Sequence, residues 1–434
     1  MRPHDSILPI SHREPRLAET LVVELRRGSQ RWLVSQDWGE KLLGDAAPDW
    51  FSLGACAQAR CVKQGNARTI WRVPVADAVV FAKVLDSPGL GRRLRQWLFG
   101  DGLRGEWRMG RELERRGVPV VRFLALGMLD ADPPRSVLIT EEFGGSKTLG
   151  HWNDPRRLFG APIDRLRVRR MVECVAQLMA KSHAGGFAHR DVHPKNILVC
   201  PDSTVEAIPK EARFVDVHGG VLSWGMTARR WVIRSLAQLA HATRRDASRT
   251  DRMRFLRSYL RLLPKESAIP TGRDGRHALV RTVDKAMTVH AENLARHRDR
   301  RLGRSDTYFA RFSPAAGWQA VVTLRLSRRN LFPEPHVPDR TLSTWRGMLA
   351  RMIKDRRSAP DFDLQELQAR DWVERLRWTI LGSPYRRAFV ECHRLRHRDQ
   401  PSPLILAYAD HRTFGLTDRS LAVRPASMNE GGGT

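Results

Sequence analysis

The stretch "AHRDVHPKNILV" (residues 188–199) constrains the fold of this chain more than any other feature. It contains His189-Arg190-Asp191, then Asn196 five positions after the aspartate, and it ends in an apolar segment typical of a strand. On one tight loop, Asp191 could accept a proton from an attacking hydroxyl while Asn196 binds Mg²⁺. These are two requirements of phosphoryl transfer.

The His-Arg-Asp triplet alone is a weak signal, because it occurs a second time at residues 397–399. There the position that matches Asn196 is Leu404, whose side chain cannot bind a metal ion. We therefore interpret the second triplet as chance, and the first gains weight only from the groups around it.

The expected elements form a β-rich half followed by a helical half. Strands are predicted for "RCVKQGNARTIWRVPV", "DAVVFAKVL", "VPVVRFLALGML" and "RSVLITEEF", and a helix for "RGEWRMGRELERRG" (104–117). After "GGSKTLG" (144–150) the pattern changes to long amphipathic helices, of which "RLRVRRMVECVAQLMAKSHAGG" is the first. Strands with one helix, followed by a mostly helical half, predict an α+β chain with two unequal lobes.

Two charged residues lie where a phosphotransferase needs them. "FVDVHGG" places Asp216 on a short apolar strand after the loop, where its carboxylate would be a second metal ligand. "VVFAKVL" places Lys83 in an otherwise apolar strand, where its ammonium would contact the phosphates of a nucleotide. The alternative for Lys83 is an ordinary lysine of an edge strand.

An acid on the helix that follows this strand should pair with the lysine, and Glu106, Glu112 and Glu114 compete for the role. We favour Glu106, because Met109 and Leu113 follow it at helical spacing and form a packing stripe. The alternative for each of the three is a solvated helix charge.

Taken together, these residues resemble the protein-kinase-like fold, and within it the lipopolysaccharide kinase (Kdo/WaaP) family. The resemblance covers roughly residues 60–260. The stretches that carry it are "GEWRMGRELERRGVPV", the hinge "ITEEFGGSKTL", "KSHAGGFAHRDVHPKNILV", and Asp216 followed by Val217-His218.

The resemblance implies a bilobal fold with a small β-rich N-lobe, which holds one helix, and a larger, mostly helical C-lobe. It implies ATP and Mg²⁺, and transfer of the γ-phosphate to a sugar hydroxyl of heptose or Kdo in the lipopolysaccharide inner core. It also implies that the catalytic residues are Asp191, Lys83 and Glu106, that Lys83, Gly65, Glu141, Asn196 and Asp216 bind the nucleotide, and that Asn196 and Asp216 bind the metal.

The sequence also departs from the patterns of these relatives. The loop that should cover the phosphates has only Gly65 in "VKQGNARTIW", and His193 stands where protein kinases have lysine. Ser235 occupies a helix position where the family usually has aspartate, so we expect weaker support of the catalytic loop. No Ala-Pro-Glu follows Asp216, which argues against a protein substrate.

The net charge of +28 indicates a phosphate-rich partner, such as the core glycolipid or an anionic membrane surface. "RRLRQWLFGDGLRGEWR" combines arginines with large apolar residues, as expected of a surface-bound membrane element. Its residues are Arg92, Arg93, Arg95 and Arg104 with Trp97, Leu98 and Phe99. The basic region 244–263 has no recognisable motif for reading nucleic acid, so we expect no nucleic-acid partner.

The five cysteines are scattered, which fits reduced thiols, and the first residues lack the apolar core of a signal peptide. We therefore expect a cytoplasmic protein, with peripheral contact at the inner membrane. The sequence does not predict an oligomeric state.

Four regions are expected along the chain: an N-terminal extension (1–50), the N-lobe (51–145), the C-lobe (146–300) and a C-terminal region (301–434). The last region contains "YRRAFVECHRLRHRDQPSPLILAYAD", which follows the pattern of residues 103–130. Both stretches give an amphipathic helix, a turn, a proline and an apolar strand. A degenerate repeat of the N-lobe is one hypothesis for the C-terminal region.

Two alternatives to a lipopolysaccharide kinase stay open. A small-molecule phosphotransferase of the aminoglycoside or choline kinase type favours His-x-Asp in the loop, and Arg190 argues only mildly against it. A non-catalytic pseudokinase scaffold would explain the missing glycines and Ser235. Retention of Asp191, Asn196 and Asp216 argues against that scaffold.

Overall fold

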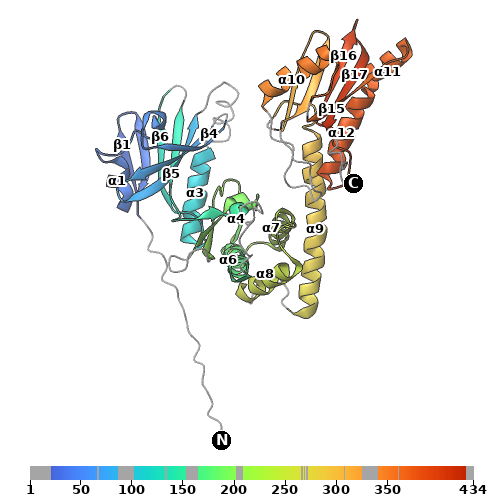
Figure 1. Cartoon of the computed structure of the whole chain (residues 1–434). Coiled ribbons are helices and arrows are strands. Elements are labelled where there is room, and N and C mark those ends of the chain that lie inside the picture. The colour runs from blue at the N-terminus through green and yellow to red at the C-terminus, as the bar shows by residue number, and fades with distance from the viewer. Residues whose placement is uncertain are drawn as a thin grey trace, which may run out of the picture. The chain divides into compact units, whose positions relative to one another are not determined.

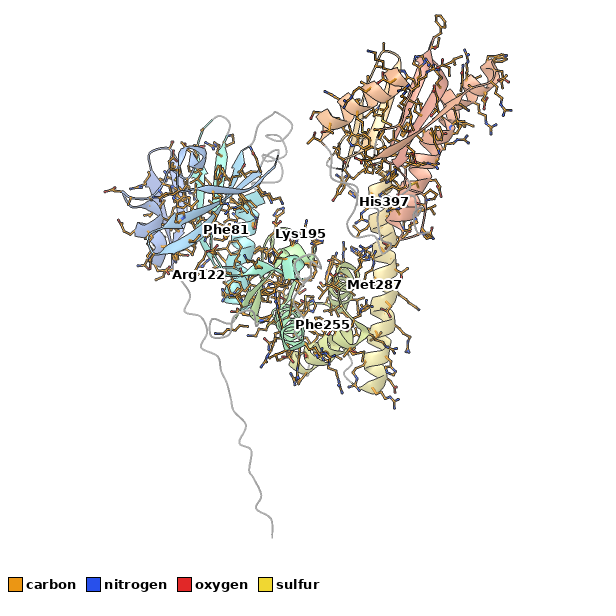
Figure 2. The ribbon with its side chains drawn as sticks, in the orientation of Figure 1. Phe81, Arg122, Lys195, Phe255, Met287 and His397 are labelled. Carbon is orange, nitrogen blue, oxygen red and sulfur yellow. The ribbon has the colours of Figure 1, made fainter. Side chains whose placement is uncertain are left out.

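The computed structural model describes residues 21–426 except 66–67, 87–101, 132–133, 153–164, 202–208, 265–266, 268, 270–271, 307, 325–340 and 360. The chain divides into two compact units, which we call unit 1 (Met1–Met287) and unit 2 (Thr288–Thr434). The division lies within α9 (Arg273–Asp299), on which Figure 2 marks Met287. Among the described residues, no helix has the length and apolar character to cross a bilayer.

Unit 1 begins with a small lobe built on a seven-stranded antiparallel sheet, ordered β1-β2-β6-β7-β5-β4-β3 (Figure 1). Its strands are β1 (Val22–Arg27), β2 (Gln30–Ser35), β3 (Arg60–Gln64), β4 (Arg68–Val75), β5 (Ala78–Asp86), β6 (Phe123–Leu129) and β7 (Arg135–Glu141). The expected N-terminal extension is not separate from this lobe. Instead, β1 and β2 continue the sheet because β2 pairs with β6.

One long helix, α3 (Gly102–Arg115), packs against β6 and β7, as the sequence predicted for this half. Its buried stripe includes Leu103, Trp107 and Leu113. Gly110 allows the close approach, because a Cβ there would lie 2.2 Å from the ring of Phe123. The other sheet face packs on the short elements η1 (Gln36–Trp38), α1 (Gly39–Leu43) and η2 (Leu53–Ala55).

The second lobe of unit 1 is mostly helical, so the bilobal arrangement that was expected from the resemblance to the protein-kinase-like fold is confirmed. Its helices are α4 (Leu149–Trp152), α6 (Arg165–Ala184), α7 (Arg229–Ala242), α8 (Arg249–Leu262) and the first part of α9. Short strands carry the loops of the lobe: β8 (Lys147–Thr148), β9 (Phe187–Ala188), β10 (Ile197–Pro201), β11 (Pro209–Phe214) and β12 (Val221–Leu222), with η3 (Pro194–Asn196) before β10. β10 pairs with β8 and β11, and β9 pairs with β12.

Unit 2 holds a five-stranded antiparallel sheet ordered β13-β14-β16-β17-β15. The strands are β13 (Phe309–Phe312), β14 (Trp318–Thr323), β15 (Phe362–Gln368), β16 (Ala407–Thr413) and β17 (Leu416–Pro425), and the helices are α10 (Leu342–Asp355), α11 (Trp372–Leu381) and α12 (Pro384–His397). α10 and α12 cover opposite faces of the sheet, since Trp345 and Phe389 belong to separate apolar clusters built on alternate strand residues.

The second His-Arg-Asp triplet ends α12 and has a structural role. His397 Nδ1 lies 2.8 Å from Asp299 Oδ1 on α9. Arg398 donates hydrogen bonds to Asp299 at 2.9 Å and to Glu292 at 3.0 Å. These contacts fix α12 to α9, which agrees with the interpretation of this triplet as chance.

Candidate active site

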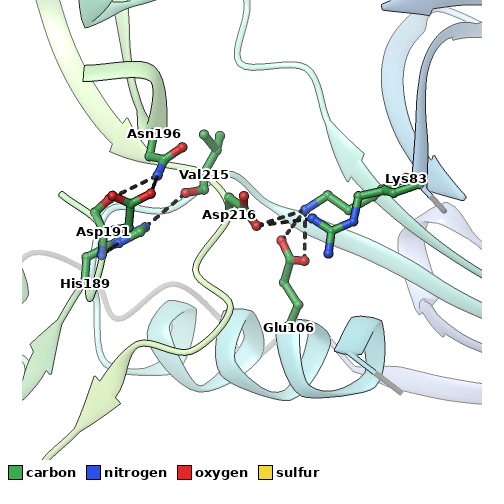
Figure 3. A network of polar contacts seen from close by, with 8 residues as sticks. Lys83, Glu106, His189, Asp191, Asn196, Val215 and Asp216 are labelled. Carbon is green, nitrogen blue, oxygen red and sulfur yellow. Dashed lines mark hydrogen bonds and ion pairs between the residues drawn. The ribbon is translucent and has the colours of Figure 1, made fainter. Parts of the chain in front are cut away.

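A buried ion pair joins the sheet of the small lobe to α3. Lys83 Nζ on β5 lies 2.6 and 2.9 Å from the two carboxylate oxygens of Glu106, as Figure 3 shows. The side chains are 15% and 3% exposed, respectively. A buried charge without a partner costs several kcal/mol, so each residue requires the other.

The two competing acids on α3 are engaged elsewhere. Glu112 pairs with Arg115 and Arg116, at 2.7 and 2.6 Å. Hydrogen bonds from these arginines lower the pKa of Glu112 to about 2 and outweigh its burial. Glu114 accepts a hydrogen bond from the backbone N–H of Phe123. The structure therefore brings Glu106, and neither competitor, to the lysine.

His189 shapes the loop that carries Asp191. Its Nδ1 accepts a hydrogen bond from the backbone N–H of Asp191 at 3.1 Å, so its Nε2 carries the proton and donates to the carbonyl of Val215 at 3.3 Å (Figure 3). Burial lowers the pKa of His189, despite the opposing effect of the hydrogen bond to Val215. A neutral imidazole thus ties the loop to the segment that leads into Asp216.

Asn196 holds the carboxylate of Asp191 in place. Its amide Nδ2 donates to the Asp191 carbonyl at 3.0 Å and to carboxylate Oδ2 at 3.2 Å. Because the nitrogen faces Asp191, the amide oxygen faces away and is available as a ligand. Asp191 itself is exposed to solvent.

Asp216 lies between the loop and the ion pair. Its Oδ1 is 3.5 Å from Lys83 Nζ and 3.8 Å from Arg68 Nη1. Burial raises the pKa of this carboxyl, but the charges of Lys83 and Arg68 outweigh burial and lower it overall. Asp216 has a positive φ of 55°, a backbone conformation that is strained for most residues and concentrates at functional sites.

Gln238 supports the catalytic loop, a role that sequence reasoning missed. Its Oε1 accepts a hydrogen bond from the Val192 N–H at 3.1 Å, and its Nε2 donates to the Arg190 carbonyl at 2.8 Å. Ser235, at the position where the family usually has aspartate, donates instead to the Trp231 carbonyl of its own helix. The expected loss of support is therefore corrected: a residue one turn further along α7 holds the loop.

The two remaining predicted residues lie in the small lobe. Gly65 follows β3, and its N–H donates to the Arg68 carbonyl at 2.9 Å across the β3–β4 turn. Glu141 is the last residue of β7, and its N–H donates to the Arg122 carbonyl at 3.0 Å. The structure gives neither residue a hydrogen bond to the Lys83 and Asp216 cluster among the described contacts.

Three arginines surround an aromatic ring beside the catalytic loop. The guanidinium groups of Arg190, Arg230 and Arg234 lie 5.7, 5.6 and 5.4 Å from the ring centroid of Trp231. All three arginines are exposed, and Arg190 precedes Asp191 in the loop. Three exposed guanidinium groups held around one indole suit a ligand that carries phosphates.

The donor set fits Mg²⁺ held together with a nucleotide. Among the described residues, no group of three or more His, Cys, Asp or Glu side chains could hold a metal ion by itself. Asn196 and Asp216 offer an amide and a carboxylate oxygen, and Mg²⁺ typically takes one or two such ligands together with phosphate oxygens. These two residues would hold the ion, and Lys83 would contact the phosphates.

Comparison with known proteins agrees with this geometry. Residues 90–259 match the model of the lipopolysaccharide kinase (Kdo/WaaP) family, which confirms the predicted resemblance and makes the protein a phosphotransferase with an alcohol group as acceptor. Asp191, Asn196 and Asp216 all lie within the matched stretch. No curated relative matches the chain.

Two solved structures are similar to the chain. "WaaP in complex with acyl carrier protein" shares 23% identity, covers 59% of this chain and 99% of its own, and has a TM-score of 0.42. "Crystal structure of BubR1 kinase domain" shares 11% identity over 62% of this chain and 87% of its own, with a TM-score of 0.34.

Proposed function

From the family match and the site geometry, we propose that this protein is an ATP- and Mg²⁺-dependent kinase of the lipopolysaccharide inner core. It transfers the γ-phosphate of ATP to a hydroxyl of heptose or Kdo, at the cytoplasmic face of the inner membrane. The observation that carries the proposal is that the Lys83–Glu106 ion pair contacts Asp216, beside the loop that holds Asp191 and Asn196. These residues belong to a chain whose residues 90–259 match the family of these kinases.

Each residue has a chemical role in this reaction. Asp191 takes the proton of the acceptor hydroxyl as the hydroxyl oxygen bonds to the γ-phosphorus and the bond to the ADP oxygen breaks. Asn196 keeps the carboxylate of Asp191 oriented. Lys83 stabilises the negative charge of the phosphates, and its ion pair with Glu106 fixes the position of its ammonium group. Mg²⁺ on Asn196 and Asp216 would supply charge neutralisation for the transferring group.

The surroundings favour a glycan acceptor over a protein. The arginines around Trp231 can bind the phosphates of a core glycan. Only a short segment separates Asp216 from the start of α7 at Arg229, which leaves little room for an activation loop. The net charge of +28 suits an acceptor that is itself anionic and membrane-borne.

The decisive experiment is transfer of labelled γ-phosphate from ATP, with Mg²⁺, to deacylated lipopolysaccharide core. We expect transfer by the wild type and a loss of roughly 10²–10⁴-fold in Asp191→Asn. Asp399→Asn is the matched control, because it changes the aspartate of the second triplet and should transfer as the wild type does. Equal loss in both variants would refute the assignment of Asp191.

The open alternatives are separated by the same assay. Transfer to a soluble aminoalcohol or aminoglycoside, without transfer to the core, would establish a small-molecule phosphotransferase. Binding of ATP without transfer to any acceptor would establish a non-catalytic scaffold. The well-formed Lys83–Glu106 pair and the Gln238 support favour an active enzyme.

A further inference from the structure

The outer face of α11 in unit 2 is apolar and exposed to solvent. Trp372, Leu376 and Ile380 follow one another at four-residue spacing, and Trp372 and Ile380 are 69% and 70% exposed. Val373 and Leu381 widen this stripe and are also exposed. A surface helix normally turns polar residues to solvent, so this stripe requires an explanation.

The exposed stripe is not the face by which α11 packs on the core, because a different face of the helix is buried. Trp378 is 4% exposed and lies on the inner side of the helix, which packs on β17. The side chain of Thr379 accepts a hydrogen bond from the Thr417 N–H at 2.8 Å. The helix is therefore fixed on the sheet by one face and presents the other.

A second large apolar side chain stands at the same end of the sheet. Phe414 is fully exposed in the turn between β16 and β17, three residues before Thr417, which contacts α11. Figure 1 shows α11 beside the end of this hairpin. We call the set Trp372, Val373, Leu376, Ile380, Leu381 and Phe414 the α11 patch.

Basic residues frame the α11 patch. Exposed arginines precede the helix, lie on it, begin α12 and precede Phe414: Arg370, Arg377, Arg386, Arg387 and Arg412. The two acids of α11 are used at its N-terminus, since Asp371 Oδ1 accepts from the Glu374 N–H and Glu374 Oε2 accepts from the Arg370 N–H. Large apolar side chains with flanking arginines form the pattern of a helix that lies in the headgroup region of an anionic bilayer.

The topology of unit 2 repeats that of the small lobe. The order β13-β14-β16-β17-β15 corresponds strand for strand to β1-β2-β6-β7-β5, with α12 in the place of α3. The two helices also end alike. The Val118 N–H donates to the Leu113 carbonyl after α3, and the Gln400 N–H donates to the Leu395 carbonyl after α12, both at 2.9 Å.

The sequence follows the same correspondence without a gap. "RRLRQWLFGDGLRGEW" (92–107) aligns with "ERLRWTILGSPYRRAF" (374–389). At this single offset the identical pairs include Arg93/Arg375, Leu94/Leu376, Arg95/Arg377, Gly100/Gly382, Arg104/Arg386, Leu113/Leu395, Arg116/Arg398 and Pro119/Pro401. The basic and aromatic segment predicted to contact a membrane is thus the sequence counterpart of α11, although its residues 92–101 lie outside the described part.

Unit 2 lacks the charged pair of the catalytic lobe. By strand register, Gln365 stands where Lys83 stands, and by the sequence offset Ala388 replaces Glu106. A copy without this pair has no counterpart of the nucleotide contact. Its exposed apolar helix therefore calls for a different ligand.

We propose that unit 2 is a non-catalytic copy of the small lobe whose α11 patch binds the surface of an anionic lipid bilayer. The apolar side chains enter the headgroup region, and the arginines contact lipid phosphates. The proposal deepens the proposed function, on which it rests only in that the acceptor is membrane-borne. Bilayer binding is measured without ATP or an acceptor, so the two proposals fail separately.

The first test is flotation of the full-length protein with vesicles of phosphatidylglycerol and phosphatidylcholine, and with vesicles of phosphatidylcholine alone. We expect binding to the anionic vesicles and a loss of about tenfold in Trp372→Ser/Ile380→Ser/Phe414→Ser. Arg377→Gln and Arg387→Gln should each weaken binding by about fivefold. Val289→Gln removes an exposed apolar residue of α9 outside the patch and should bind as the wild type does.

The second test locates the contact. Lipids brominated in the acyl chain quench only tryptophans that enter the bilayer. Trp372→Phe should therefore keep vesicle binding and lose the quenching that Trp372 contributes, whereas Trp97, in the segment predicted to contact the membrane, keeps its own contribution. Trp224→Phe alters a fully exposed tryptophan of unit 1 and should leave quenching unchanged.

Wild-type binding by the triple variant would overturn the proposal, as would quenching that depends on Trp224 instead. A change from dimer to monomer in the triple variant, with no change in vesicle binding, would show a contact between copies and would also overturn it. Phosphotransfer to deacylated core should be unchanged in the triple variant, and a matching loss there would indicate misfolding, which Trp372→Phe avoids.

Discussion

The small lobe of unit 1 and the sheet of unit 2 share a strand order, the position of a helix and the way that helix ends, but they differ in chemistry. In the small lobe, Lys83 and Glu106 form an ion pair between the sheet and α3. In unit 2, Gln365 and Ala388 occupy the matching positions. The fold of such a lobe therefore does not require the ion pair. This difference suggests that the pair is retained in unit 1 for its chemistry.

The largest effect expected from this comparison is on catalysis. Lys83→Met removes the ammonium that we propose contacts the phosphates and leaves Glu106 buried alone, so transfer should fall roughly 10²–10³-fold. Gln365→Met is the matched change in unit 2 and should leave the rate unchanged. The measurement is initial rate with labelled ATP, and Lys83→Met/Glu106→Gln controls for the uncompensated charge. Equal losses of transfer rate in Lys83→Met and Gln365→Met would contradict a difference in chemistry between the two units.

Support of the catalytic loop gives the next effect. Gln238→Leu leaves the Val192 N–H and the Arg190 carbonyl without a partner, at about 1–3 kcal/mol each. We expect the free energy of unfolding to fall by the sum of the two costs, about 2–6 kcal/mol, and kcat to fall with it. Ser235→Ala removes only a bond within α7 and should cost less than about 1 kcal/mol. If Ser235→Ala were the more harmful change, the loop would depend on the serine.

Acidic pH should lower the free energy of unfolding of both units for the same reason. His183 in unit 1 and His393 in unit 2 are buried, and burial lowers the pKa of each from 6.5 to about 3. Between these values the unfolded chain binds protons that the native chain does not, so stability is full above pH 6.5 and falls as pH drops. The slope is up to about 1.4 kcal/mol per pH unit for each histidine.

Denaturant unfolding at pH 7.5 and 5.5 measures this slope. His183→Gln should reduce the pH dependence of unit 1 only, and His393→Gln that of unit 2 only. A slope of the opposite sign would contradict the burial of the neutral imidazoles.

The smallest expected effect is a difference in stability between the C-terminal ends of α3 and α12. Gly117 and Asp399 both have positive φ, of 68° and 56°, at matching positions after α3 and α12. Gly117→Ala should destabilise unit 1 by about 1 kcal/mol, because nothing lies within 4 Å of the added Cβ and the cost is that of the backbone. Asp399→Gly should stabilise unit 2 slightly. Thermal unfolding resolves both changes, and a stabilising Gly117→Ala would refute the shared helix end.

Much of the candidate active site could be predicted from local sequence. Asp191 and Asn196 share one loop, and Lys83 and Asp216 were recognisable as charges in short apolar strands. Glu106 could be chosen among three acids because its helical spacing places it on the buried stripe of α3. Such features depend on residues near one another in the chain.

What sequence reasoning missed depends on contacts between distant segments. Gln238 reaches residues 190 and 192 from another element, and only its place in the apolar run "SLAQLA" could have drawn attention to it. The pairing of β2 with β6 made the expected N-terminal extension part of the sheet. Repetition in the C-terminal region was expected only as a hypothesis, since the shared strand order appears only after pairing is known.

The amide of Gln238 has a consequence for how the enzyme responds to its surroundings. A carboxylate in this position would only accept hydrogen bonds, and it would lose its charge in sufficiently acidic solution. The amide both donates and accepts, and it carries no proton that ordinary pH can add or remove. The hydrogen bonds from Gln238 to the catalytic loop therefore have the same strength at acidic and neutral pH. They add no ionisation of their own to the pH profile of the enzyme.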